Sequence, residues 1–252
     1  MTRLISGVIL AAAALGAILY LPDPALRVLA CAVAALAAHE FVRIVRTDAR
    51  FVVAAVVLCW VASGPAGVDA DLAVAAAIAL GAVAVLALRG TVTEAAAGLF
   101  GAVYVGGPLA MLAAGHASLG SRATLLLLGT IVVSDSAQFY TGRLFGRHPL
   151  APTISPKKTI EGAAGGLVVA TAAMVLAGAG VFPSMSAAAL AGLGIVVVLS
   201  GICGDLFESA LKRAAGLKDS SHLIPGHGGV LDRIDALLFA APAFYLYLRA
   251  VA

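Results

Sequence analysis

The sequence predicts an all-α, polytopic integral membrane protein with about nine transmembrane helices. Two observations carry this prediction. Hydrophobic residues make up 62% of the 252 positions and charged residues only 12%, with a mean hydropathy of +1.07. A soluble domain has about 25% charged residues. The apolar residues also gather into runs that approach the ~20 residues a membrane-spanning helix needs.

Nine such runs are separated by turn-forming or charged residues. They are 4–21, 25–44, 51–63, 72–88, 93–115, 123–140, 160–181, 186–206 and 234–252. The third run is short, so it is either a less tilted span or a re-entrant segment. The first run follows Arg3 as a signal peptide would, but it is longer than the usual hydrophobic region of one, so we expect it to be retained.

The Lys and Arg residues predict the orientation of these spans. With the N-terminus in the cytoplasm, thirteen of the sixteen fall on the inner side and only Arg27, Arg122 and Arg249 on the outer side. This distribution follows the positive-inside rule. The two charged stretches of the chain, 134–166 and 204–235, are therefore expected in the cytoplasm.

Composition also bears on partners. The few basic residues do not interleave with aromatic ones, which argues against nucleic-acid binding. Cys31, Cys59 and Cys203 lie in apolar runs without a CxxC pair, which argues against a disulfide framework or a zinc site. Abundant Ala and Gly permit close helix contacts, and so permit a homodimer without requiring one.

The most informative stretch is 204–235, which lies between two strongly apolar runs. Its charged residues are Asp205, Glu208, Lys212, Arg213, Lys218, Asp219, Asp232, Arg233 and Asp235. On a helix, Asp205, Glu208, Ser209 and Lys212 would share one face, as would Asp232 and Asp235 on the next. The segment 225–229, Pro-Gly-His-Gly-Gly, cannot be regular helix. Carboxylates on two helices around a basic loop can hold Mg²⁺ against phosphate oxygens. The alternative for each single residue is a snorkelling or capping role.

A second polar stretch, 134–166, precedes and opens the seventh run. Ser155, Lys157, Lys158 and Thr159 stand directly before that run, with Arg143 upstream. Ammonium groups, hydroxyls and the backbone N–H groups of a helix start suit an anion. The GxxxxGK[ST] pattern of a Walker A loop is absent. The alternative is a positive-inside loop followed by a capped helix.

A lone polar pair, His39-Glu40, ends the second run. We interpret it as an interfacial pair with capping value, although ionisable residues inside a membrane are also candidates for function.

The two stretches resemble the signature of the phosphatidate cytidylyltransferase family, also called CDP-diacylglycerol synthase. The first block is Ser209, Lys212-Arg213, Lys218-Asp219, Pro225, His227-Gly228-Gly229 and Asp232-Arg233-Ile234-Asp235. The second, shared with bacterial members, includes Asp135-Ser136, Gly142-Arg143 and Ile154-Ser155-Pro156-Lys157-Lys158-Thr159. The family often has Ala-Tyr where this chain has Gln138 and Phe139, so Tyr140 would have to supply that hydroxyl. The resemblance covers about residues 130–240.

The resemblance implies transfer of the cytidylyl group of CTP to phosphatidic acid, giving CDP-diacylglycerol and pyrophosphate for phospholipid synthesis. It implies Mg²⁺ as cofactor, and CTP, phosphatidic acid and the lipid bilayer as partners. It also implies cytoplasmic catalytic loops in a bacterial-type inner membrane. The nucleophile is an ionised phosphate, so catalysis consists mainly of positioning and charge stabilisation.

We assign roles to residues on this basis. Asp205 and Asp232 are the expected metal ligands, because they approach from two different helices. The expected catalytic residues are Lys212, Arg213, Lys218, Asp219, His227 and Asp235. The expected substrate-binding residues are Ser155, Lys157, Lys158, Thr159, Arg143, Ser209, Gly228 and Gly229.

The expected organisation is a single membrane unit, with N-terminal transmembrane helices over 1–120 and the catalytic region over 121–252. One rival function is a CTP-dependent lipid kinase of the polyprenol type, which would release CDP. Another is a transporter whose Asp135 and Asp205 line a pathway, but it predicts charges spread over the whole membrane depth. An inactive scaffold is a third, against which the intact charged set argues.

Overall fold

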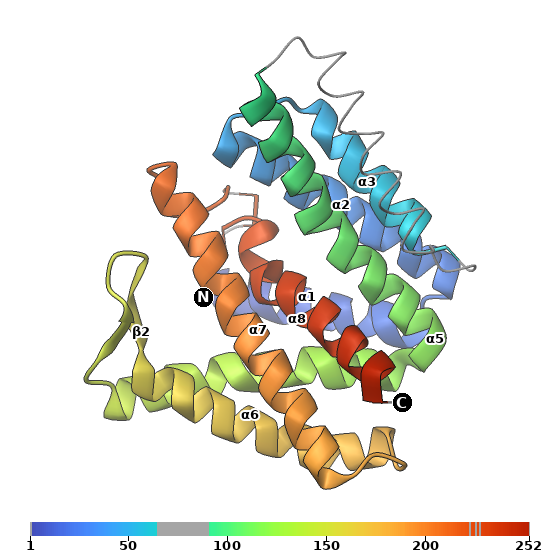
Figure 1. The fold of residues 1–252 in the computed structure, drawn as a ribbon, viewed down its shortest axis with the longest axis vertical. Helices are drawn as coiled ribbons and strands as arrows, with labels where there is room; N and C mark the ends of the chain where they lie inside the picture. The colour runs from blue at the N-terminus through green and yellow to red at the C-terminus, as the bar shows by residue number, and fades with distance from the viewer. Residues whose placement is uncertain (1, 65–90, 222, 225, 227, 252) are drawn as a thin grey trace. The chain divides into compact units, whose positions relative to one another are not determined.

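A computed structural model of the chain describes residues 2–64, 91–221, 223, 224, 226 and 228–251 (Figure 1). Its elements in chain order are α1 (Thr2–Tyr20), α2 (Asp23–Val45), α3 (Arg50–Ala62), α5 (Val92–Phe145), β1 (Pro149–Ala151), β2 (Ser155–Thr159), α6 (Ile160–Val181), α7 (Ala187–Ala214) and α8 (Leu231–Val251). The predicted span 72–88 and the predicted site residue His227 lie outside the described residues, as does Pro225.

The helices confirm a multi-pass membrane protein. Among the described residues, five helices are long and apolar enough to cross a bilayer, namely α2, α5, α6, α7 and α8. The described part of the chain is helical over the other eight predicted runs, but α3 and the apolar part of α1 are shorter than a usual span. The count of nine spans and their orientation remain predictions.

Helix α5 contains a break that the sequence predicted between its fifth and sixth runs. Gly120 has φ 81° and ψ 174°, which is not helical and which only glycine adopts without strain. Residues 92–119 and 121–145 are therefore two helical arms. The first arm begins with a capping box, in which the amide of Glu94 donates to Thr91 Oγ1 and the amide of Thr91 donates to Glu94 Oε2, each over 3.2 Å.

The prediction of purely helical structure was wrong for one segment. Residues 149–159 form a two-stranded antiparallel hairpin, with Pro149 opposite Thr159 and Ala151 opposite Ser155. The sixth predicted run also ended too early, because the second arm of α5 continues to Phe145 and carries Arg143 within the helix.

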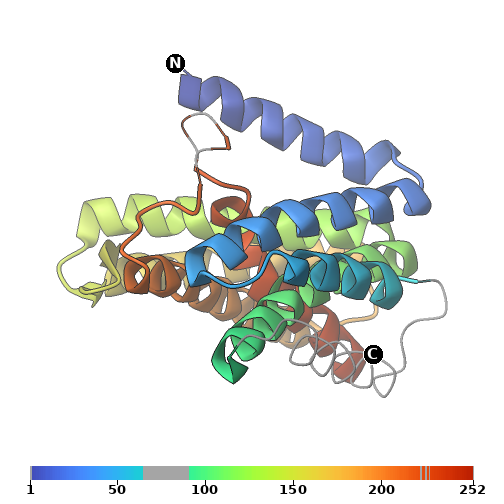
Figure 2. The ribbon, with the colours of Figure 1, turned by 90° about the horizontal axis from the view of Figure 1, so that it is seen from above.

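The described chain divides into two compact units. The first comprises 1–118 and 214–234, and the second 119–213 and 235–252. In the first unit, α2 lies beside α3 (Figures 1 and 2). The rings of Phe41, Phe100 and Tyr104 stack between α2 and the first arm of α5. A Cβ on Gly101 would lie 2.3 Å from the Phe41 ring, so glycine allows this close packing.

The second unit is held together by small residues at its helix crossings. The second arm of α5 runs beside α6 (Figure 1), where a Cβ on Gly165 would lie 2.4 Å from Thr141 Oγ1. Ala170 of α6 and Val198 and Ile202 of α7 form a buried cluster. Helices α7 and α8 cross at Gly204, whose Cβ would lie 2.4 Å from the carbonyl oxygen of Asp235. Close crossing through small residues is typical of membrane helices.

Candidate active site

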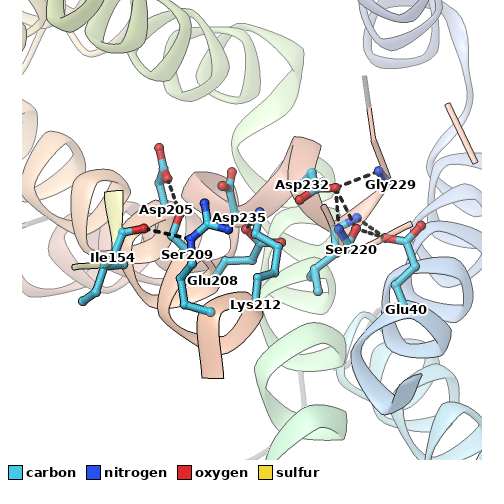
Figure 3. Close-up of polar contacts among 12 residues, drawn as sticks. Glu40, Ile154, Asp205, Glu208, Ser209, Lys212, Ser220, Gly229, Asp232 and Asp235 are labelled. Carbon is cyan, nitrogen blue, oxygen red and sulfur yellow. Dashed lines mark hydrogen bonds and ion pairs between the residues drawn. The ribbon is translucent and has the colours of Figure 1, made fainter. Parts of the chain in front are cut away.

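The C-terminal part of α7 carries the acidic face that the spacing predicted. Asp205, Glu208, Ser209 and Lys212 all lie on this continuous helix, and Ser209 Oγ donates to Asp205 Oδ1 over 3.4 Å (Figure 3). Glu208 is fully buried and forms an ion pair with Lys212 one turn later. The positive charge of Lys212 is thus already compensated within the helix. Its predicted catalytic role remains a prediction.

The hairpin forms a basic wall against this face, within the same unit. The ammonium group of Lys158 pairs with Asp205 Oδ2, and Arg213 Nε donates to the carbonyl oxygen of Ile154 over 3.3 Å. The hairpin is therefore attached to α7 at two points. Lys157 and Arg143 are exposed, and Ser155 is half-buried.

The base of the hairpin is fixed by the first turn of α6. Thr159 is the N-cap residue, and its Oγ1 accepts from the amide of Gly162 over 3.1 Å. The Glu161 carboxylate accepts from the amides of Arg147 and His148 over 3.1 and 3.2 Å, and lies 2.6 Å from His148 Nδ1. Thr159 thus has a capping role here, while its predicted role in substrate binding stays untested.

Asp235 belongs to the same acidic group as Asp205. The crossing at Gly204 sets the two aspartates on facing turns of α7 and α8, and Asp205, Lys212 and Asp135 are the charged groups that act on Asp235. Asp135 is exposed near the end of α5, and Gln138 Nε2 approaches its Oδ1 at 3.4 Å. The motif in the sequence contains Asp135, but its electrostatic effect on Asp235 joins α5 to α8, which the local sequence does not relate.

The departure from the family pattern at Gln138 also has a structural role. Gln138 Nε2 donates to Ser134 Oγ over 3.0 Å. The backbone carbonyl oxygen of Gln138 packs against Gly162 of α6, where a Cβ would lie only 2.8 Å away. Tyr140 is exposed at 62%. The side chain at 138 therefore orients the polar end of α5.

In the other unit, Asp232 organises the segment that leads into α8. Its Oδ2 atom accepts from the Ser220 amide (2.9 Å), the Ser220 hydroxyl (2.8 Å) and the Gly229 amide (2.8 Å) (Figure 3). Gly228 has φ +81°, and a Cβ there would lie 2.5 Å from Asp232 Oδ2. Gly228 is thus required by its packing against the Asp232 carboxylate, to which the Gly229 amide donates. Lys218 and Asp219 lie exposed earlier in the same segment.

Glu40 is the residue that sequence reasoning did not connect to the site. It is 3% exposed and accepts hydrogen bonds from the segment 220–231. The capping part of the interpretation of His39-Glu40 is confirmed for Glu40, which accepts from the amide of Leu231, the first residue of α8. The interfacial part remains a prediction. No local pattern reveals a contact across 180 positions. The only signal was a carboxylate in an apolar run.

The residues present fit a divalent cation in chemistry rather than in preformed geometry. No group of three or more His, Cys, Asp or Glu side chains in the described ranges is arranged to hold a metal. Asp205, Asp235 and Asp135 nevertheless supply the carboxylate oxygens that Mg²⁺ prefers. The predicted pairing of Asp205 with Asp232 takes one residue from each unit and remains a prediction.

The class that the structure defines is that of multi-pass membrane proteins, because five helices among the described residues are long and apolar enough to cross a bilayer. The sequence model of the cytidylyltransferase family matches residues 1–251, and the chain belongs to that family.

Individual relatives agree with this assignment. The chain is 41% identical over 132 residues to a phosphatidate cytidylyltransferase of Mycobacterium bovis, covering 51% of this chain and 42% of the relative. It is 47% identical over 135 residues to that of Haemophilus influenzae, covering 49% and 45%. An uncharacterized Escherichia coli protein, YnbB, is 41% identical over 141 residues, covering 56% and 47%. The chain thus spans about half the length of the curated relatives it matches.

Proposed function

We propose that this chain transfers the cytidylyl group of CTP to phosphatidic acid, giving CDP-diacylglycerol and pyrophosphate. The observation that carries the proposal is the contact of the basic hairpin with the acidic face of α7, through Lys158 and Asp205, in a member of the cytidylyltransferase family. The phosphatidate cytidylyltransferases among its relatives support the choice of lipid.

The arrangement suits a reaction between two anions. An oxygen of the lipid phosphate attacks the α-phosphorus of CTP. A new P–O bond forms, the bond from the α-phosphorus to the oxygen of the β-phosphate breaks, and pyrophosphate leaves. The attacking phosphate is already ionised at neutral pH, so no strong base is needed. The barrier is set by charge repulsion and alignment.

The chain's own residues can both reduce the charge repulsion and align the two phosphates. Lys158 and the exposed Lys157 offer ammonium groups to phosphate oxygens beside α7, and Arg143 adds a further cation on α5. Asp205 and Asp235 would hold Mg²⁺, with Asp135 as a further carboxylate that acts on Asp235. When bound, that ion neutralises phosphate charge. The carboxylates act here as metal ligands and not as proton carriers.

The site is further proposed to face the cytoplasm of a bacterial-type inner membrane. The Lys and Arg distribution supports this orientation. Two observed contacts agree with it, because each joins segments assigned to the inner side: Glu40 with Ser220, and Lys158 with Asp205.

The test is product analysis on the purified full chain in detergent with mixed phosphatidic acid micelles, Mg²⁺ and CTP labelled in the cytosine ring. We expect label in the lipid phase, dependent on both Mg²⁺ and phosphatidic acid. Unlabelled lipid, with CDP formed when an isoprenoid alcohol is supplied, would instead assign the chain as a lipid kinase.

A further inference from the structure

Glu40 is a buried carboxylate near the C-terminal end of α2, and the structure supplies it with four hydrogen-bond donors. Its partners are Ser220 Oγ (2.8 Å), Ser221 Oγ (2.7 Å), the Val230 amide (3.0 Å) and the Leu231 amide (2.8 Å). Burying an ionised carboxylate is costly unless donors compensate it. All four of these donors come from one distant segment, 220–231, so the compensation ties that segment to α2 within the first unit.

The donors lie at both ends of the segment. Ser220 and Ser221 belong to its start, whereas Val230 and Leu231 belong to its end, and Leu231 is the first residue of α8. One carboxylate therefore binds residues from both ends, and Figure 3 shows Glu40 facing Ser220. The same carboxylate stands at a helix N-terminus, where backbone N–H groups lack helical partners and negative charge is favourable.

Asp232 closes the same loop through a shared side chain. Ser220 Oγ lies 2.8 Å from Glu40 Oε2 and 2.8 Å from Asp232 Oδ2. A hydroxyl has a single proton, so it cannot donate to both carboxylates at once. The hydroxyl therefore donates to one of the two carboxylates at a time, and Ser220 bridges Glu40 and Asp232. In this way Glu40 acts on the orientation of Asp232 through Ser220.

Gly229 shows how closely the loop fits against Glu40. A Cβ at this position would lie 2.2 Å from Glu40 Oε2 and 2.0 Å from Ser220 Oγ. No side chain fits there without displacing one of them. The second glycine of the motif is therefore required by Glu40, a residue of the N-terminal helices.

We infer that Glu40 is a positioning residue for cytidylyl transfer. It fixes Ser220, Ser221, Val230 and Leu231 and, through Ser220, sets the orientation of Asp232. The catalytic part of this inference rests on the proposed function. The structural part does not, and it can be tested separately.

The test compares Glu40→Gln with His39→Gln, an exposed neighbour on the same helix, by hydrogen–deuterium exchange of the full chain in detergent. The glutamine keeps the volume but loses the charge and replaces one acceptor with a donor. We expect the amides of Ser220 and 229–231 to exchange at least about tenfold faster, since hydrogen bonds to charged groups are worth more than one decade in equilibrium constant. Exchange in α6 and α7 should stay unchanged, and His39→Gln should match the wild type.

The kinetic arm measures both constants. Glu40→Gln should lower kcat about tenfold or more while leaving KM for CTP within about twofold, because the loop is misplaced but the hairpin lysines are intact. Ser221→Ala removes one of the donors to Glu40 and leaves the buried charge of Glu40 unchanged. Like Glu40→Gln, it should make the Val230 amide exchange faster. This second variant decides the matter if Glu40→Gln does not fold.

Three results would overturn the inference. They are unchanged exchange at 229–231, faster exchange throughout α6 and α7 as well, and a kcat equal to that of the wild type. A wild-type chain without cytidylyl transfer would overturn the proposed function and the catalytic part of the inference together. The exchange data would then decide alone whether Glu40 fixes the segment.

Discussion

Replacing Asp205 with asparagine separates a catalytic role from a structural one at the centre of the proposed site. Asp205 pairs with Lys158, and the two side chains are 31% and 23% exposed. A partly solvated ion pair contributes about 1 kcal/mol or less to stability. Lys158 retains access to water, so its loss of partner does not leave a buried charge. For a chain of this size, the unfolding temperature should fall by no more than about 2–4 °C.

The expected loss of activity is much larger. Removing one preorganised electrostatic group from a transferase site typically costs about 100-fold or more in kcat. The assay is the initial rate of lipid labelling at saturating CTP, phosphatidic acid and Mg²⁺, with thermal unfolding measured on the same preparation. Asp205→Asn should therefore retain its fold and lose at least about 99% of its turnover.

The matched control is Asp48→Asn. Asp48 pairs with Arg50 at 3.2 Å outside the proposed site, and the substitution makes the same chemical change. It should leave turnover near the wild-type level. The reasoning about Asp205 would be refuted if Asp205→Asn kept more than half of the turnover. It would also be refuted if both variants lost turnover in proportion to the fall in their unfolding temperatures.

Four further predictions each concern a single residue. Asp232→Asn should keep the fold, because an asparagine carbonyl can still accept from Ser220 and Gly229. It should lose turnover about 100-fold, and near-normal rates would remove Asp232 from the metal ligands that the sequence predicts. Lys157→Ala should raise KM for CTP about tenfold, because it removes the proposed charge-assisted contact between the ammonium group and a CTP phosphate. An effect on KM for the lipid alone would assign the hairpin to the lipid phosphate instead. Gly229→Ala should lower the free energy of unfolding by about 1–3 kcal/mol through overpacking. The control is Gly107→Ala, which should not lower it, because a Cβ there would meet nothing within 4 Å. Equal effects of the two substitutions would contradict the packing argument. The Arg50 amide and guanidinium lower the pKa of Asp48. The stability difference between wild type and Asp48→Asn should therefore be fully present at pH 7, begin to fall below about pH 4, and disappear as Asp48 becomes protonated in the folded protein. A difference that does not fall at all as the pH is lowered from 7 through this range would contradict it.

Local spacing predicted well where one helix decides the geometry. Asp205, Glu208, Ser209 and Lys212 share a face of α7 because residues three and four apart must do so in any α-helix. The break near residue 120 was predictable in the same way, from a glycine among turn-forming residues. These features depend on neighbours in the sequence, and the sequence displays them directly.

Features that depend on distant segments could not be predicted in this way. The hairpin strand 155–159, Ser-Pro-Lys-Lys-Thr, has no alternation of apolar and polar residues, so the sequence alone predicts a loop there. Its pairing with Asp205 spans 47 positions, and that of Glu40 with Ser220 spans 180. Asp235 lies beside Asp205 because Gly204 lets two helices approach, which no local pattern encodes. Each of these contacts is a property of packing.

The most direct test of the central claim is the fate of two labels in CTP. The wild-type chain would be incubated with phosphatidic acid micelles and Mg²⁺, once with CTP carrying radioactive phosphorus at the α-position and once at the γ-position. Cytidylyl transfer predicts that α-label enters the lipid phase and that γ-label appears in pyrophosphate. Label from the γ-position in lipid would mean kinase chemistry, and lipid without either label would contradict the account altogether.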